Sequence, residues 1–327
     1  MRRREFVTFL GGTVAAWSLA AHAQKAALPV VAFIRDGSAD GSQRYVTAFR
    51  KGLNENGFVE GQNVTVEYHW LEGQYDRLPA LLADLVGRQV AVIATPGTLP
   101  TRTAKAATAT IPIVFGIGDD PVRLGLVASL ARPGGNATGI NFFVNELTAK
   151  RLRLLHELVP KAVRIGVLVN PGNALVAEAT VREIQKAAPT MGLEIQILNA
   201  TTIGEIDAAF GILARERLNA LLVAGDAFLI SRRVQLATLT ARDRIPSAYA
   251  TRDPVEAGGL MSYGTSLADS FRQIGVYTGT ILKGAKPADL PVLQSTKFEF
   301  VINRLTARAL GIEVPPGVIS IADEVIE

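Results

Sequence analysis

The feature that most constrains the fold is an alternation of short apolar runs with amphipathic stretches along nearly the whole chain. The runs at residues 29–34, 90–94 and 111–115 have the length and composition of strands buried on both faces. Between them, Tyr45, Phe49 and Leu53 recur every four residues, which indicates one buried face of a helix. This alternation predicts parallel sheets with helices on both sides, an α/β fold.

A cluster of breaking residues divides the alternation into two halves. A short helix is expected at 124–130, residues 132–136 then read Arg-Pro-Gly-Gly-Asn, and the rhythm restarts with expected helices at 149–158, 177–191 and 267–282. About ten strands result, which suits two sheets better than one. The length of 327 residues also fits about two domains. An eightfold barrel needs an uninterrupted ring of units, so the central break disfavours it.

The first 23 residues are typical of an export signal. Residues 2–4 are all Arg, an apolar stretch diluted by glycine follows, and residues 21–23 read Ala-His-Ala, which fits a cleavage site. The apolar stretch is too short and too rich in glycine to span a membrane. The paired arginines favour the twin-arginine route, with a Sec signal as the alternative. We therefore expect a mature chain that starts at Gln24 and acts in the periplasm.

Composition excludes several classes of function. Because the sequence has no Cys, it offers no thiolate metal site, no iron–sulfur cluster and no cysteine nucleophile. Loss of the leader lowers the net charge from +4 to +2, and so nearly neutral a chain has no electrostatic footprint for nucleic acid. His69 and His156 lie too far apart for a metal pair, and no phosphate-binding or nucleophile motif is complete. We expect no metal, no cofactor and no enzymatic activity.

Candidate ligand-binding residues follow from the predicted strand ends. In open parallel sheets, ligands bind beyond the carboxyl ends of the strands. Hydroxyls, amides, carboxylates and one arginine occur there, a set that suits a small polar or zwitterionic molecule. An aspartate can bind a ligand ammonium and an arginine a carboxylate, while capping of the following helices is the alternative role. The predicted site comprises Ser38, Thr95, Gly97, Asp119, Asn170, Asp226, Arg252 and Tyr263.

Longer motifs carry a resemblance to a known family. They include Gly118-Asp119-Asp120-Pro121-Val122, the Ala-Arg-Pro-Gly-Gly-Asn run at 131–136, and segments at 169–171, 257–264, 281–292, 297–303 and 322–327. Together they resemble the ABC-transporter substrate-binding proteins, the family that includes tryptophan- and tyrosine-binding lipoproteins. The resemblance extends over essentially the whole mature chain.

This resemblance implies a type I periplasmic-binding-protein fold, in which two Rossmann-like lobes with parallel sheets are joined by three crossings and close on a ligand. Mapped onto this sequence, lobe 1 spans residues 27–139 and 264–295, and lobe 2 spans residues 140–263 and 296–327. It further implies a receptor that hands its ligand to an ABC permease in the inner membrane. The ligand varies within the family, so the resemblance does not supply it, and our own prediction from the site residues is an amino-acid-like molecule or an aromatic carboxylate. We expect the receptor to be a monomer.

One departure from the family concerns membrane attachment. Lipoprotein members carry a lipidated Cys after the signal, and this sequence contains no Cys, so we expect a protein that is free in the periplasm. Two other functions stay open at this stage. One is a binding protein that serves a membrane sensor, and the other is a periplasmic enzyme on the same fold.

Overall fold

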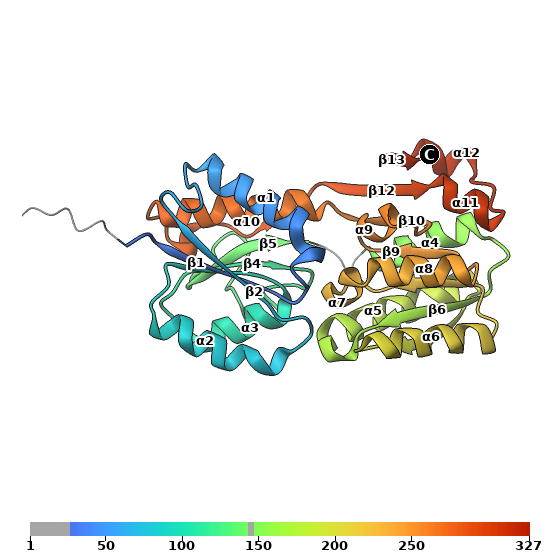
Figure 1. Cartoon of the computed structure of the whole chain (residues 1–327), viewed down its shortest axis with the longest axis horizontal. Helices are drawn as coiled ribbons and strands as arrows, with labels where there is room; N and C mark the ends of the chain where they lie inside the picture. Colours follow the sequence, from blue (N-terminus) through green and yellow to red (C-terminus); the bar gives the residue numbers. More distant parts are fainter. Residues whose placement is uncertain (1–26, 143–146) are drawn as a thin grey trace, which may run out of the picture.

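The computed structural model describes residues 27–142 and 147–327 and has two α/β lobes side by side (Figure 1). Each lobe is a sheet covered by helices, as the strand–helix alternation predicts. The predicted leader, residues 1–23, lies outside the described residues. In the described ranges, no helix is long and apolar enough to cross a membrane.

The first lobe is built on a six-stranded sheet in which every pair is parallel. Its central strands are buried along almost their whole length, because helices cover both faces. In spatial order the strands are β11 (Leu293–Gln294), β5 (Ala137–Asn141), β4 (Ile113–Ile117), β3 (Val92–Pro96), β1 (Val30–Arg35) and β2 (Thr65–Trp70).

Two pairs of helices cover this sheet. Helices α1 (Gln43–Glu55) and α10 (Leu267–Leu282) pack on one face, and α2 (Leu78–Gly87) and α3 (Thr98–Ala107) pack on the other. The α1–α10 contact is close because each helix brings a glycine to it. A Cβ at Gly52 would overlap the backbone of α10, and a Cβ at Gly275 would overlap the backbone of α1. This packing assigns α10 to the first lobe although it comes late in the chain.

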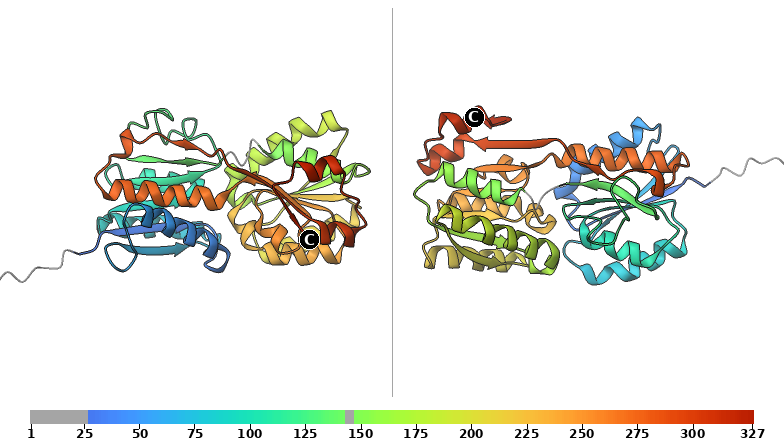
Figure 2. Two further views of the ribbon diagram at one scale, coloured as in Figure 1. Left: turned by 90° about the horizontal axis from the view of Figure 1, so that it is seen from above. Right: turned by 180° about the vertical axis from the view of Figure 1, so that it is seen from behind.

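The second lobe is built on a seven-stranded sheet. In spatial order its strands are β13 (Glu324–Ile326), β12 (Phe298–Asn303), β10 (Met261–Thr265), β9 (Ser247–Tyr249), β8 (Ala220–Val223), β6 (Arg164–Val169) and β7 (Glu194–Asn199). The prediction of parallel sheets fails at one pair, because β10 and β12 are antiparallel. The chain enters β12 on its way back from the first lobe, so β12 runs against β10, and the two lie side by side at the junction (Figure 2).

Helices cover both faces of the second sheet and enclose one large apolar core. Helix α4 contacts α5 and the strands β9 and β10, while α6 contacts α8 and β7. The helices are α4 (Thr148–Leu158), α5 (Ala174–Ala187), α6 (Ile203–Arg215), α7 (Ala227–Ser231), α8 (Arg233–Arg242), α9 (Asp253–Glu256), α11 (Arg304–Leu310) and α12 (Pro316–Ser320).

The chain passes between the lobes three times: after β5, after β10 and after β11. Strand pairing places Ile140 and Asn141 in the first sheet, and Gly264 and Thr265 in the second. The two sheets therefore extend two residues beyond the predicted divisions at 139 and 263, because the strands run on into the crossings.

The expected helix at 124–130 does not form. This segment consists of turns, in which the N–H of Gly125 donates to Val122 and that of Leu126 donates to Pro121. Gly125 has a φ of +69°, which ends any right-handed helix at that point. Leu126 and Val127 are nevertheless buried in the core of the first lobe, so the apolar spacing reflects burial rather than helical periodicity.

Candidate functional site

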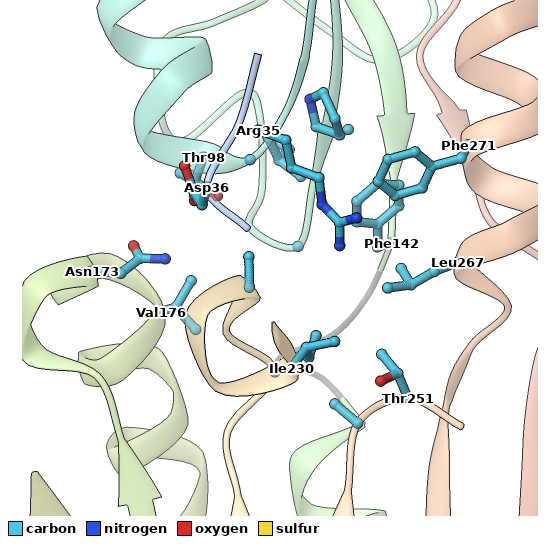
Figure 3. Close-up of a pocket in the computed structure, with 18 residues that line it drawn as sticks. Arg35, Asp36, Thr98, Phe142, Asn173, Val176, Ile230, Thr251, Leu267 and Phe271 are labelled. Atoms are coloured by element: carbon cyan, nitrogen blue, oxygen red, sulfur yellow. The ribbon is translucent and has the colours of Figure 1, made fainter. Parts of the chain in front are cut away.

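A cavity of about 80 Å³ lies between the two lobes (Figure 3). It is lined in the first lobe by residues that end or follow β1, β3 and β4, where the strand-end rule places a ligand. Residues from the loops and helices of the second lobe close the opposite side. The lining residues are Arg35, Asp36, Pro96, Gly97, Thr98, Gly116, Ile117, Gly118, Phe142, Asn173, Val176, Gly225, Ala227, Ile230, Ala250, Thr251, Leu267 and Phe271.

The positive charge of the cavity comes from Arg35, the last residue of β1. Its side chain is 3% exposed, and its guanidinium extends into the cavity (Figure 3). The guanidinium carbon lies 4.3 Å from the ring centre of Tyr45 and 4.9 Å from that of Phe271, and Nη1 donates to the Ser42 hydroxyl at 2.9 Å. Burial lowers the pKa of Arg35, and nearby acidic groups oppose this shift. The planar guanidinium is therefore held in place at the cavity wall, in a geometry that can bind a carboxylate.

The acidic residue among the described residues that line the cavity is Asp36, which follows Arg35 directly. Asp36 is 2% exposed, and its Oδ1 has no hydrogen-bond partner among the described residues. Burial, together with the charge of Asp226 across the cleft, raises the pKa of Asp36 to about 8, although Arg35 acts in the opposite direction. A buried carboxylate with an unused oxygen attracts a ligand that brings a donor or a positive charge.

The remaining wall of the cavity is largely apolar. Phe142 and Phe271 lie with ring centres 6.4 Å apart and planes inclined by 16°, and Leu267, Ile230 and Val176 extend the apolar surface (Figure 3). A glycine on β4 makes room for this arrangement, because a Cβ at position 116 would overlap the ring of Phe142. The combination of two aromatic rings with a few converging polar groups is typical of a pocket for a small organic molecule.

Two further polar features face the cavity. Helix α3 begins at Thr98 after Gly97, and no side chain caps this N-terminus, so its first N–H groups remain available near the cavity. The Thr251 hydroxyl is buried without a hydrogen-bond partner among the described residues. Both features can bind polar atoms of a ligand.

Contacts across the cleft hold the lobes together. The Tyr45 hydroxyl of α1 donates to Asp253 Oδ2 of α9 at 2.5 Å, and both side chains are buried. Nearer the surface, Arg44 Nη1 lies 3.0 Å from Glu256 Oε1. These pairs join the first lobe to the second and favour the arrangement of the lobes in this structure.

Of the predicted site residues in the first lobe, Gly97 lines the cavity and the others lie behind or beside it. The Thr95 hydroxyl is 2.9 Å from that of Thr101, inside the lobe. Asp119 accepts a hydrogen bond of 2.9 Å from the Thr98 hydroxyl. Ser38 interacts with its own turn, where its carbonyl oxygen accepts from Ser42. These residues support the wall of the cavity.

Asp226 and Asn170 form a buried hydrogen-bond network behind the second-lobe wall. Asp226 Oδ1 accepts from Asn170 Nδ2 at 3.0 Å and from the N–H groups of Phe228 and Leu229, while Oδ2 accepts from Asn173 Nδ2 at 3.0 Å. Asp226 is thus the N-cap of α7, the capping role that the sequence left open. Burial raises the pKa of Asp226, and these four hydrogen bonds oppose the shift.

Arg252 and Tyr263 lie away from the cavity wall. Arg252 makes ion pairs with Glu256, Glu324 and Glu299 at 2.6, 2.6 and 3.6 Å, so it ties α9 to the C-terminal segment. The ring of Tyr263 packs edge-on against Phe300, in the core of the second lobe. Neither residue lines the cavity.

The eight predicted site residues do not include the charged pair Arg35 and Asp36 or the rings of Phe142 and Phe271. Asp36 and Thr251 do follow predicted strands, and Phe142 lies near a predicted crossing, so position alone could have included them. Arg35 lies one residue beyond the strand predicted at 29–34, whereas the structure makes it the last residue of β1. The described residues contain no group of three His, Asp or Glu side chains arranged to hold a metal ion.

Comparison with known proteins shows the family of this chain. The family model for ABC transporter substrate binding proteins matches residues 27–326, so the chain belongs to that family. A tyrosine-binding protein of Clostridioides difficile (strain R20291) is 26% identical over 265 residues, which cover 81% of this chain and 76% of that protein.

Solved structures are similar in fold. A domain from Streptococcus pneumonia in complex with L-Trp is 24% identical, with a TM-score of 0.80 over 91% of this chain and 100% of that chain. A conserved domain protein from Vibrio cholerae is 26% identical, with a TM-score of 0.81 over 91% of this chain and 99% of its own. The ligand-free, open structure of a substrate binding protein from Clostridium difficile is 25% identical, with a TM-score of 0.64 over 92% and 99%. The chain is an ABC-transporter substrate-binding protein with the type I periplasmic-binding fold.

Proposed function

We propose that this protein captures one small molecule between its two lobes and delivers it to an ABC permease in the inner membrane. The observation that carries the proposal is the cavity between the lobes, which combines a buried Arg–Asp pair with an aromatic wall at the strand ends. The family of the chain supports the receptor role. Export by the predicted leader, action in the periplasm as a monomer and movement of the lobes about the three crossings complete the proposal.

The ligand we propose is an amino-acid-like molecule or an aromatic carboxylate. Arg35 can hold the carboxylate of such a molecule in a bidentate pair, and the N–H groups at the start of α3 can assist. Phe142 and Phe271 can receive its apolar or aromatic body. Relatives whose names record tyrosine or tryptophan as ligand agree with this class.

We also propose that the protein releases its ligand chemically unchanged. The cavity offers one Arg–Asp pair, two hydroxyls and an amide as its polar groups in the described part of the chain, and no hydroxyl there is paired with a histidine that could activate it. The family and its structural neighbours are binding proteins, which supports the same conclusion.

A thermal-shift screen of the mature protein with amino acids and aromatic acids tests the receptor function. A ligand at 100 times its Kd should stabilise the protein by about 2.7 kcal/mol, which is a clear shift of the melting temperature. Arg35→Gln should weaken the binding of carboxylate ligands by about 30-fold or more. Arg153→Gln, on the exposed face of α4, is the matched control and should bind like wild type. Equal binding by wild type and Arg35→Gln would refute the proposed carboxylate site.

A further inference from the structure

Negative charge exceeds positive charge around the cavity. Among the described residues that line it, Arg35 and Asp36 are the charged pair. Two more buried carboxylates stand close behind: Asp226, which raises the pKa of Asp36, and Asp253, which faces Arg35 through Tyr45. One buried guanidinium therefore lies near three buried carboxyl groups, and an imbalance of charge is costly at a buried site.

The carboxylates differ in how completely they are hydrogen-bonded. Asp226 accepts from four donors, and Asp253 accepts from the Tyr45 hydroxyl. Asp119, behind Thr98, accepts from the Thr98 hydroxyl. Asp36 is the exception, because its buried Oδ1 has no hydrogen-bond partner in the described ranges. Asp36 Oδ1 therefore lacks the hydrogen-bond donor that a buried carboxylate oxygen needs, and a bound ligand can supply it.

We infer that the ligand carries a positively charged amine and that Asp36 is the residue that binds it. The inference rests on the proposed receptor function and assigns the specificity of its site. An ammonium group supplies both a hydrogen-bond donor for Oδ1 and the charge that the cavity lacks. A neutral hydroxyl would supply the donor without the charge, and a metal ion would need more acidic or imidazole ligands than the cavity offers.

The same geometry couples the amine to closure of the cleft. Asp36 belongs to the first lobe and Asp226 to the second, so closure brings two carboxylates toward each other. The other titratable groups that face Asp36 are Arg35, next to it in sequence, and Tyr75, whose pKa is raised by burial and by the two carboxylates. An ammonium placed at Asp36 favours the charged form of this carboxyl group and offsets its interaction with Asp226, so an amine-bearing ligand favours the closed form and a deaminated analogue does not.

Matched pairs of compounds test the inference by titration calorimetry on the mature full chain. The pairs are L-phenylalanine with 3-phenylpropanoate, L-tyrosine with 3-(4-hydroxyphenyl)propanoate, L-tryptophan with indole-3-propanoate and L-leucine with 4-methylpentanoate. In each pair the carboxylate and the apolar body stay the same while the amine is removed. For at least one pair, we expect the amine-bearing member to bind about 30-fold or more tightly than its partner.

Asp36→Asn should remove most of this discrimination, because the amide keeps the shape of the side chain and loses its charge. Asp289→Asn, an exposed position on the turn Pro287–Asp289, is the matched control and should preserve the discrimination. Circular dichroism of each variant checks that it is folded. Discrimination that survives in Asp36→Asn would overturn the assignment to Asp36.

The outcomes separate this inference from the receptor function. If the deaminated carboxylates bind as tightly as the amino acids, the amine inference is wrong and the receptor function stands. If no compound of the panel binds wild type, both the amine inference and the amino-acid-like ligand class are wrong.

Discussion

Replacing Asp36 by Asn should stabilise the ligand-free protein, and the gain should depend on pH. Because burial and the nearby charge of Asp226 raise the pKa of Asp36 from 3.8 to about 8, the folded protein keeps the proton that the unfolded chain has already lost. The free energy of unfolding of wild type therefore decreases as pH rises through this window, and the loss is complete above about pH 8. Asparagine does not titrate, so the variant avoids this loss.

The structure sets the magnitude of the effect. One pKa unit corresponds to about 1.4 kcal/mol, so the shift of Asp36 amounts to roughly 5–6 kcal/mol. This figure is a ceiling, because opening of the cleft separates Asp36 from Asp226 and relieves part of the cost. We expect Asp36→Asn to exceed wild type by about 2 kcal/mol or more at pH 9 and to differ little from it near pH 4.

Urea unfolding at a series of pH values measures this difference. Trp70 on β2, whose ring stacks on Tyr68 at 6.0 Å, reports the unfolding of the first lobe by fluorescence. Asp289→Asn should follow wild type at every pH. A difference between Asp36→Asn and wild type that stays constant within about 0.5 kcal/mol from pH 4 to pH 9 would refute the reasoning, because a group that does not titrate in the window gives no slope.

Three other changes give expected outcomes. Tyr45→Phe removes the buried hydrogen bond to Asp253 between the lobes and should destabilise the closed form by about 1.5–3 kcal/mol, which small-angle scattering at a fixed, subsaturating ligand concentration detects as a larger radius of gyration. Gly116→Ala should lower stability by about 1–3 kcal/mol and weaken ligand binding, since the new methyl group displaces the Phe142 ring; calorimetry and thermal melts that match wild type would contradict this. Exchanging the paired arginines of the leader for lysine should block export if the twin-arginine route is used, whereas a periplasmic product with Gln24 at its N-terminus would favour Sec.

Strongly periodic segments were predictable from sequence alone. The helix expected at 267–282 has the same bounds as α10, because its apolar residues recur at helical spacing and Gly284 follows its end. The buried strands β1, β3 and β4 lie within a few residues of their predicted positions, since short apolar runs between polar loops have few other structures open to them.

How the segments pair and pack in three dimensions was harder to predict from the sequence. The antiparallel pairing of β12 with β10 depends on the direction in which the chain returns from the first lobe, and no local pattern encodes that direction. The apolar residues at 124–130 have the spacing of a helix because Leu126 and Val127 are buried. The segment does not form a helix because Gly125 has a positive φ.

For the site, the sequence predicted where the candidate residues lie better than it predicted what each side chain contacts. Of the residues selected by the strand-end rule, Gly97 lines the cavity, and Thr95, Asp119 and Asn170 lie beside lining residues. It could not distinguish Asp226, whose oxygens accept four hydrogen bonds, from Asp36, whose Oδ1 has none among the described residues. That distinction depends on which donors the fold brings to each carboxylate, and the donors of Asp226 come from two segments, the turn after β6 and the start of α7.

The central claim is that one small molecule binds between the lobes and leaves unchanged. Native mass spectrometry of the mature protein, loaded with the best compound of the panel, tests it directly. Ala227→Trp is the informative variant, because Ala227 lines the cavity at the start of α7 and an indole there fills the space. We predict one ligand per wild-type chain, none on Ala227→Trp, and a released compound of unaltered mass. Equal loading of the variant, or a released compound of different mass, would contradict the account.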